Sequence, residues 1–346
     1  MLRRLLLAIF AQLYITGVKF RHFLYNAEFI RGEGFDVPII CVGNITVGGS
    51  GKTPMCELLI EHFAPQFEVA ILSRGYGRRT RGYREVLATD DYHKTGDEPL
   101  QMKQKYPEVL VVVCKNRVEA VKRIAREHPE VNLIIMDDGF QHRKILPKIN
   151  VIMLDFTRPF YTDSPLPLGT LRDTPDELHR ADYFIVTKCP AKMSDLDISF
   201  VTREIEATPH QRTYLTTIEN LPPTPISGGE PIEFEPIQEV IAMAAIGNPV
   251  PFVEMVEKRY TLVEKLLYSD HHNYNRGDLN EIKKVLKQHP KAVILTTEKD
   301  WVKLLKNNKL TDEIAERIFF TPMKMKFLTG SSSDLLLNIE KDVRKN

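Results

Sequence analysis

The glycine-rich stretch at residues 42–54, VGNITVGGSGKTP, constrains the fold of this chain more than any other segment. The apolar run before it, residues 37–42, predicts a buried strand, and a helical pattern begins after it. A strand, a glycine-rich turn and a helix in that order are the context of a phosphate-binding P-loop. Glycines let backbone N–H groups curl around an anion, and the new helix points its N-terminal dipole at that anion. The stretch therefore predicts a site for a nucleoside triphosphate such as ATP.

The residue types of this loop predict how it would hold the nucleotide. Lys52 would reach the β- and γ-phosphates, and the Thr53 hydroxyl would hold Mg²⁺. The other residues expected to contact the nucleotide are Val47, Gly48, Gly49, Ser50, Gly51 and Pro54. The strict P-loop pattern has glycine where this chain has Thr46, so a flexible turn with an incidental Lys-Thr is the alternative reading.

Length and composition describe a globular chain. Its 346 residues suit two domains of ordinary size, and 43% hydrophobic with 27% charged residues is not the composition of a disordered protein. The net charge of +1 argues against a dedicated nucleic-acid binder. The cysteines form no CxxC pair, which favours reduced thiols over disulfides or a zinc site; they are Cys41, Cys56, Cys114 and Cys189.

The first 26 residues differ from the rest of the chain. Residues 5–18, LLLAIFAQLYITGV, are apolar except for a narrow polar stripe, and the run is shorter than the ~20 residues that a membrane-spanning helix needs. Basic residues flank the run on both sides: Arg3, Arg4, Lys19, Arg21, His22 and Arg31. A signal peptide and a buried core helix are the alternatives. The pattern favours a helix that lies on the anionic cytoplasmic leaflet of a membrane.

Three further segments place polar residues near the ends of predicted strands. Residues 69–72 lead into the basic loop SRGYGRR, whose arginines we interpret as clamps for an anionic substrate, with a nucleic-acid-like patch or a solvated loop as alternatives. Residues 131–136 end in Asp137 and Asp138, as a Walker-B strand does, although a simple strand-end turn is possible. Asp97 lies in the Gly/Pro-bounded segment TGDEP and is a weak signal on its own.

Taken together, these segments resemble the tetraacyldisaccharide 4′-kinase family of lipid A biosynthesis. The matching pieces follow the family's order from residue 42 to about residue 305: VGNITVGGSGKTP, LSRGYGR, TGDEP, DDGFQH, PLPLGTLRD, RADYFIVTK, AIGNP, SDHHNY and LTTEKDWVKL. The combination of GGSGKTP, SRGYGR and DDGFQH is specific to that family among P-loop proteins.

The resemblance implies a reaction and a set of site residues. The γ-phosphate of ATP would pass to the 4′-hydroxyl of an acylated disaccharide 1-phosphate. The implied catalytic residues are Lys52, Asp97 and His271, with His272 as the alternative partner of Asp97. The implied substrate-binding residues are Arg74, Tyr76, Arg78, His142 and Arg172. The implied Mg²⁺ ligands are Thr53, Asp137, Asp138 and Asp173, although the family tends to have glutamate where this chain has Asp173.

The predicted architecture is an α/β fold in three parts. Residues 1–26 would form the membrane-associated helix, residues 27–157 a P-loop NTPase-like α/β domain, and residues 158–346 a second, smaller α/β domain that includes a Pro/Gly-rich bridge. ATP would bind in the cleft between the domains, and the Asp97–His271 pair would form when that cleft closes. We expect a monomer at the cytoplasmic face of the inner membrane, without a nucleic-acid partner.

The alternative function is a P-loop GTPase switch or a metallochaperone-type NTPase. A GTPase carries Asn-Lys-x-Asp at a strand end to recognise guanine. The corresponding segment here is Thr187-Lys-Cys-Pro190, which lacks both the asparagine and the aspartate. The sequence therefore favours the kinase.

Overall fold

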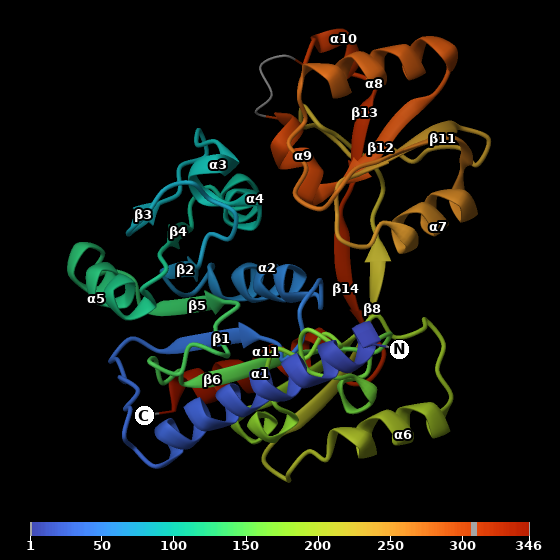
Figure 1. The fold of residues 1–346 in the computed structure, drawn as a ribbon. Helices are drawn as coiled ribbons and strands as arrows, with labels where there is room; N and C mark the ends of the chain where they lie inside the picture. Colours follow the sequence, from blue (N-terminus) through green and yellow to red (C-terminus); the bar gives the residue numbers. More distant parts are fainter. Residues whose placement is uncertain (1, 306–309, 346) are drawn as a thin grey trace.

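Two twisted sheets of nine and five strands, each covered by helices, make up the molecule (Figure 1). The computed structural model describes residues 2–305 and 310–345. Residue 1 of the predicted membrane-associated helix, and residues 306–309 and 346 of the predicted second domain, therefore lie outside the described part. The α/β class predicted from the sequence is confirmed.

The larger sheet is parallel except at its two edges. Its strand order is β14-β8-β7-β6-β1-β5-β2-β4-β3, and only β14 and β3 run antiparallel to their neighbours. Its strands are β1 (Ile39–Gly43), β2 (Val69–Ser73), β3 (Arg84–Glu85), β4 (Leu110–Val113), β5 (Leu133–Asp137), β6 (Ile149–Asp155), β7 (Tyr183–Thr187), β8 (Arg212–Asn220) and β14 (Met323–Phe327). Because parallel strands end at the same edge, the polar residues that follow β1, β2 and β5 meet there.

Alternate residues of these strands enter two separate cores. In β5, Leu133 and Ile135 face α2, α4 and α11, whereas Ile134 and Met136 face α5, α6 and η2. The helices of this unit are α1 (Leu2–Asn26), α2 (Lys52–Phe63), α3 (Tyr92–Thr95), α4 (Asp97–Lys105), α5 (Arg117–Glu127), η1 (Phe160–Thr162), η2 (Pro175–Arg180), α6 (Asp195–Ile205) and α11 (Ser332–Arg344). Burial of both faces explains why the predicted strands are uninterrupted apolar runs.

The smaller sheet has the order β11-β10-β12-β13-β9, with only β9 antiparallel. Its strands are β9 (Thr224–Pro225), β10 (Glu239–Ala244), β11 (Thr261–Leu267), β12 (Val293–Thr297) and β13 (Ile318–Thr321). Its helices are α7 (Val250–Arg259), α8 (Arg276–Gln288), α9 (Glu298–Leu305) and α10 (Asp312–Ala315). Side chains of α9 enter both units, because Val302 packs in a core of the larger sheet and Leu304 packs in a core of the smaller one.

The chain crosses between the two sheets twice, at neighbouring positions. β8 leads into the smaller sheet and β14 leads back, and these two strands pair with each other, with Asn220 opposite Met323. Figure 1 shows the pair at the junction of the two units. The division into domains at residue 157 stays a prediction; β7, β8 and β14, which follow that residue, belong to the larger sheet.

The N-terminal helix α1 buries only a narrow stripe. Ala11, Ile15 and His22 face inward, at spacings that place them on one side of a helix. The rest of its surface carries exposed large apolar side chains: Leu5, Leu6, Ile9, Phe10, Leu13, Phe20 and Phe23. In the part of the chain that the structure describes, no helix, α1 included, has the length and apolarity needed to cross a bilayer.

Helix α11 offers a test of the larger core. Leu335 is fully buried against the sheet, whereas Leu337, on the same helix, is 53% exposed. We expect Leu335→Ala to lower the free energy of unfolding by about 2–5 kcal/mol, because it removes buried methyl groups and leaves a cavity. Leu337→Ala should change it by less than about 0.5 kcal/mol. Chemical denaturation measures both, and equal effects would mean that α11 does not pack as described.

Candidate active site

The loop after β1 has the shape of an anion-binding turn. Gly48 and Gly51 have φ of 99° and 87°, in the left-handed region that favours glycine, and α2 begins directly after Gly51. The ends of the loop are fastened, since the Asn44 side chain donates to Ser50 Oγ (2.7 Å) and Thr187 Oγ1 donates to the Ser50 carbonyl (3.0 Å). The middle of the loop, residues 47–49, is exposed. The backbone N–H groups of Gly48 and Gly49 are therefore accessible to a phosphate, whereas that of Val47, predicted as a nucleotide contact, donates to the Thr170 carbonyl (2.8 Å).

Lys52, Asp138 and Arg172 form a charged group beside this loop. Lys52 Nζ lies 3.4 Å from Asp138 Oδ1. Arg172 grips Asp138 with both terminal nitrogens, one of them 3.1 Å from Oδ2, and it also donates to the Asn44 side chain. Burial opposes ionisation of Asp138, but the hydrogen bond from Arg172 and the charge of Lys52 outweigh it and lower the pKa of Asp138. The predicted residues Lys52, Asp138 and Arg172 thus meet in the fold.

Asp137 has a different environment from its neighbour. Its carboxylate accepts from Ser73 Oγ (3.2 Å) and lies 3.9 Å from Cys56 Sγ, which are both neutral groups. Within the described residues no cationic side chain forms an ion pair with it. Burial, and then the charge of Asp138, raise the pKa of Asp137 to about 6. A buried carboxylate without a cation of its own is a suitable ligand for a metal ion.

Asp173, predicted as a metal ligand, makes contacts on the side of α1. Its carboxylate oxygens receive His22 Nε2 (2.6 Å), Gln141 Nε2 (3.0 Å) and the Thr174 amide (3.0 Å). The contacts found for Asp173 among the described residues do not include Asp137, Asp138 or Thr53. Arg172 and Asp173 are adjacent in the chain, but the Arg172 side chain contacts Asp138, whereas the Asp173 side chain contacts His22. The structure does not bring Asp173 to the other predicted metal ligands.

Asp97 and His271 come from different units and contact each other. His271 Nδ1 lies 3.0 Å from Asp97 Oδ2. Asp97 is the first residue of α4, so the TGDEP segment, predicted as a loop, opens a helix instead, with Gly96 at φ 96° before it. The alternative partner His272 contacts Asp278 at 2.8 Å, within its own unit. The structure therefore pairs Asp97 with His271 and not with His272.

Two lysines of α9 contact this pair, and neither was among the residues predicted from the sequence. Lys303 is almost fully buried, with Nζ 3.5 Å from Asp97 and 3.3 Å from Asp300. Lys299 lies 3.3 Å from His271 Nε2 and 3.3 Å from Glu98. Both belong to the EKDWVKL segment, where a spacing of four residues places them on one helix face. That spacing is the sequence signal that could have identified them.

The predicted substrate loop after β2 lies beside the pair. The Tyr76 ring is exposed, and its centroid lies 5.5 Å from that of His271. Arg78 donates to the Val113 and Gly82 carbonyls (3.1 and 2.6 Å), which holds the loop in shape. Arg74 is exposed. The guanidinium of Arg78 is therefore bound to the protein itself, whereas the side chains of Arg74 and Tyr76 are exposed.

A cluster of cationic side chains surrounds His142. Burial, and then the charges of Arg117, Lys144, Arg74 and Arg21, lower the pKa of His142 to about 4. Four buried nitrogen atoms of the region have no hydrogen-bond partner among the described residues: Nε of Arg21, Arg117 and Arg172, and Nε2 of His142. Buried polar atoms are normally satisfied, so this cluster is suited to an anionic ligand. Arg117 and Arg21 were not predicted as site residues.

Known proteins of one family resemble the chain along nearly its full length. The family model described as tetraacyldisaccharide-1-P 4′-kinase matches residues 3–341. The chain is 35% identical to the tetraacyldisaccharide 4′-kinase of Phocaeicola vulgatus, over 96% of this chain and 93% of that protein. It is 33% identical to the enzyme of the same name from Bacteroides thetaiotaomicron, over 96% and 92%. The crystal structure of LpxK from Aquifex aeolicus, described as an "apo" form in complex with ATP, matches with a TM-score of 0.76 and 27% identity, over 99% of this chain and all of that one.

The Asp97–His271 contact makes a prediction about pH. The hydrogen bond that His271 donates to the Asp97 carboxylate raises the pKa of His271 above 6.5. Because the folded-state pKa is raised, the contact stabilises the protein fully below pH 6.5, and this stabilisation is lost as the pH rises through the raised value. Histidine resonances followed by NMR should show the pKa of His271 falling in Asp97→Asn.

His128 provides the internal control for this titration. Its pKa is also raised by a carboxylate, Glu85, and the contacts of His128 among the described residues are with Glu85 and Glu130, not with Asp97. The His128 titration should be the same in the wild type and in Asp97→Asn. An unchanged pKa of His271 in the variant would contradict the pairing.

Proposed function

The chain belongs to the tetraacyldisaccharide-1-P 4′-kinase family, and from that premise we propose how its residues perform the reaction. As a member it is an ATP-dependent kinase of lipid A biosynthesis that phosphorylates the 4′ position of a tetraacyldisaccharide 1-phosphate. Its P-loop would hold the ATP phosphates through the exposed amides of Gly48 and Gly49. Lys52 would neutralise the charge that spreads over the γ-phosphate as the bond to ADP breaks.

Arg172 would support this phosphate end of the site. It neutralises Asp138, which in turn lies beside Lys52, so the three side chains fix one another. Phosphoryl transfer depends mainly on positioning and charge stabilisation. A fixed Lys52 would therefore contribute more to the rate than a mobile one.

Asp97 would accept the proton of the acceptor hydroxyl. Burial disfavours its ionised form, but the hydrogen bond with His271 and the charges of Lys303 and Lys299 outweigh burial and lower the pKa of Asp97. The carboxylate is thus ionised at neutral pH and ready to accept a proton. As the P–O bond to the sugar forms, that proton would pass to Asp97, and His271 would orient the carboxylate and share the added charge.

The cationic cluster around His142 is the observation that most supports an anionic sugar lipid as the acceptor. Its positive charges would attract an anion, and the 1-phosphate of the acceptor supplies one. The neutral state of His142 suits a hydrogen bond to a sugar or phosphate oxygen. A nucleotide switch that binds a protein has no need of such a cluster. We therefore place the 1-phosphate near Arg21, Arg74 and Arg117.

The environment of Asp137 fits a magnesium ion. The described residues contain no group of three or more His, Cys, Asp or Glu side chains that could enclose a metal. Mg²⁺ does not need such a group, since it commonly binds one or two carboxylates together with substrate phosphates. Asp137 and the Thr53 hydroxyl would hold it, and the ion would neutralise charge on the β- and γ-phosphates. The contacts of Asp173 do not support a place for it in this ligand set.

The outer face of α1 would attach the enzyme to the membrane that contains its lipid. Exposed large apolar side chains follow one another along this helix, far beyond the scattered residues of an ordinary surface. Arg3, Arg4 and Lys19 are exposed and could pair with anionic lipid headgroups. The helix would lie on the cytoplasmic face of the inner membrane.

Lys52→Ala tests the phosphate site. With labelled ATP and the tetraacyldisaccharide 1-phosphate, we expect kcat to fall by about 10²–10³-fold, because the main neutralising charge is lost. Lys122 is an exposed lysine of α5 that pairs with Glu33, and Lys122→Ala should leave kcat unchanged. ATP consumption that does not depend on the acceptor, or normal turnover of Lys52→Ala, would refute the proposed mechanism.

A triple variant tests membrane attachment. Replacing Phe10, Leu13 and Phe20 by serine should move the protein from sedimented vesicles of anionic lipid to the supernatant, because these side chains are exposed and apolar. The same change at Ile232, Ile237 and Leu337, which are exposed elsewhere, is the control and should not alter partition. Vesicle binding that survives the first triple change would exclude the outer face of α1 as the attachment surface.

A further inference from the structure

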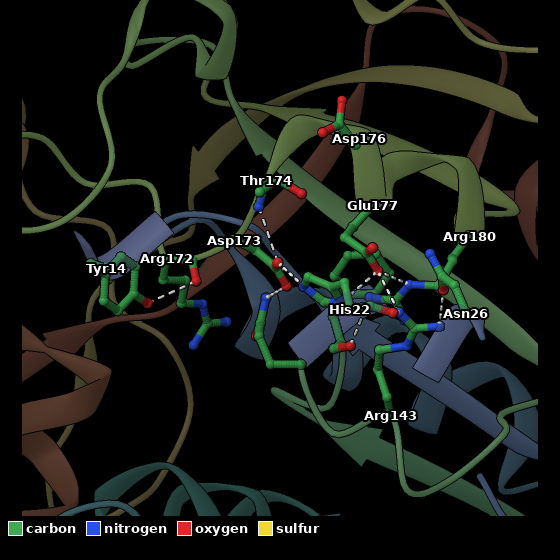
Figure 2. A network of polar contacts seen from close by, with 12 residues as sticks. Tyr14, His22, Asn26, Arg143, Arg172, Asp173, Thr174, Asp176, Glu177 and Arg180 are labelled. Carbon is green, nitrogen blue, oxygen red and sulfur yellow. Dashed lines mark hydrogen bonds and ion pairs between the residues drawn. The ribbon is translucent and has the colours of Figure 1, made fainter. Parts of the chain in front are cut away.

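The inward face of α1 carries a buried histidine surrounded by charged groups. His22 is 4% exposed, and its Nε2 lies 2.6 Å from Asp173 Oδ1. Its Nδ1 lies 3.1 Å from Glu177 Oε2 and 3.0 Å from an Arg143 nitrogen. Figure 2 shows these side chains converging from α1, from the segment before β6 and from the start of η2. The sequence grouped His22 with the basic flank of a membrane helix, but the structure buries it against the protein.

A second contact joins α1 to the same segment two turns earlier. Tyr14 Oη donates to the carbonyl oxygen of Arg172 (2.9 Å). Tyr14 thus holds the backbone of residue 172, and His22 holds the side chain of residue 173 (Figure 2). Two successive residues are fastened to one helix.

The other side of this segment is fastened to the nucleotide loop. The amides of Arg172 and Asp173 both donate to the Ile45 carbonyl (2.9 and 3.2 Å). Gln141 Nε2 bridges the Asn44 carbonyl and Asp173 Oδ2 (2.9 and 3.0 Å). The segment therefore lies between α1 and the beginning of the P-loop.

We propose that His22 is a positioning residue of the active site, which acts through Asp173 on Arg172. With residues 172 and 173 held between α1 and Ile45, the Arg172 guanidinium is directed onto Asp138 and the Asn44 side chain. Asp138 is the partner of Lys52, so the inward face of α1 helps to fix the phosphate end of the site. Asp173 is then a bridging carboxylate of this scaffold. The inference rests on the proposed function, since it concerns the same site.

This proposal gives the two faces of α1 separate tasks. The outer face attaches the enzyme, whereas the inward face supports catalysis even when no membrane is present. Deletion of the whole helix removes both faces and cannot distinguish them. Point variants of the inward face, assayed with a soluble short-chain acceptor, can distinguish the two tasks.

His22→Ala is the principal variant. It leaves the buried carboxylates of Asp173 and Glu177 without their imidazole, and a small displacement of catalytic groups lowers a rate strongly. With a short-chain disaccharide 1-phosphate in the absence of vesicles, we expect kcat to fall by about 10–100-fold, with KM values for ATP and acceptor changed less than about threefold. Partition onto anionic vesicles should be unchanged.

Further variants separate positioning from a general loss of structure. His22→Gln places an amide nitrogen near the position of Nε2 and should recover most of the lost kcat. Tyr14→Phe removes one hydroxyl and should lower kcat by a smaller factor than His22→Ala, again with little change in KM. This variant still tests the proposal if His22→Ala does not fold. His128→Ala, which removes another histidine paired with a glutamate, should keep wild-type kcat.

Hydrogen exchange gives a readout that is independent of activity. In His22→Gln, Tyr14→Phe and, if folded, His22→Ala, the amides of residues 44–46 and 171–174 should exchange faster in proportion to the loss of kcat, while those of α5 should not change. Wild-type kcat in His22→Ala, a loss confined to KM, or no rescue by glutamine would overturn the proposal. If the wild type itself does not phosphorylate the acceptor, the proposed function fails, and the exchange data still decide whether His22 holds the segment.

Discussion

A buried carboxylate must have a cation or a hydrogen-bond donor beside it, and this constraint decides which segments of the chain meet. Asp97 at the start of α4 is such a carboxylate and requires His271 and Lys303, and the half-buried Asp138, directly after β5, pairs with Lys52 and Arg172. Lys303 has less than 2% of its surface exposed, so its charge is compatible with the interior only while Asp97 and Asp300 remain beside it. The packing of the smaller sheet against α4 is therefore coupled to the ionisation of Asp97.

The central strands and the nucleotide loop could be predicted because their signals are local. Each central strand is an apolar run that ends in polar residues, and the predicted strand at residues 131–136 corresponds to β5. Edge strands carry weaker patterns: β14 reads MKMKF, and its partner β8 lies about a hundred residues earlier. No periodicity within a window of ordinary length links them. The sheet to which a strand after residue 157 belongs depends on such distant pairings, which no local pattern shows.

Sequence motifs identified candidate site residues, but they did not show in which direction each side chain points. Lys52, Asp138 and Arg172 lie together beside the glycine-rich loop, but Asp173, next in the chain to Arg172, turns to His22. Nothing in the local sequence distinguishes these two directions, because the partner is on a helix some 150 residues away. His22 itself follows an arginine in a basic segment, where an exposed position is the ordinary expectation. Burial of that histidine is a property of the tertiary structure.

The paired crossing of β8 and β14 also affects the order in which the protein can form during synthesis. β8 leaves the ribosome about a hundred residues before β14, and the intervening chain contains the whole smaller sheet. Until β14 arrives, β8 is an open edge strand, whose unpaired backbone groups invite association with other chains. Non-local strand pairing of this kind is slow, since a long loop must close before the contact is made. If the smaller sheet folds before β14 pairs, it brings residues 220 and 323 together, because both lie at its junction with the larger sheet, and the loop that must close becomes shorter.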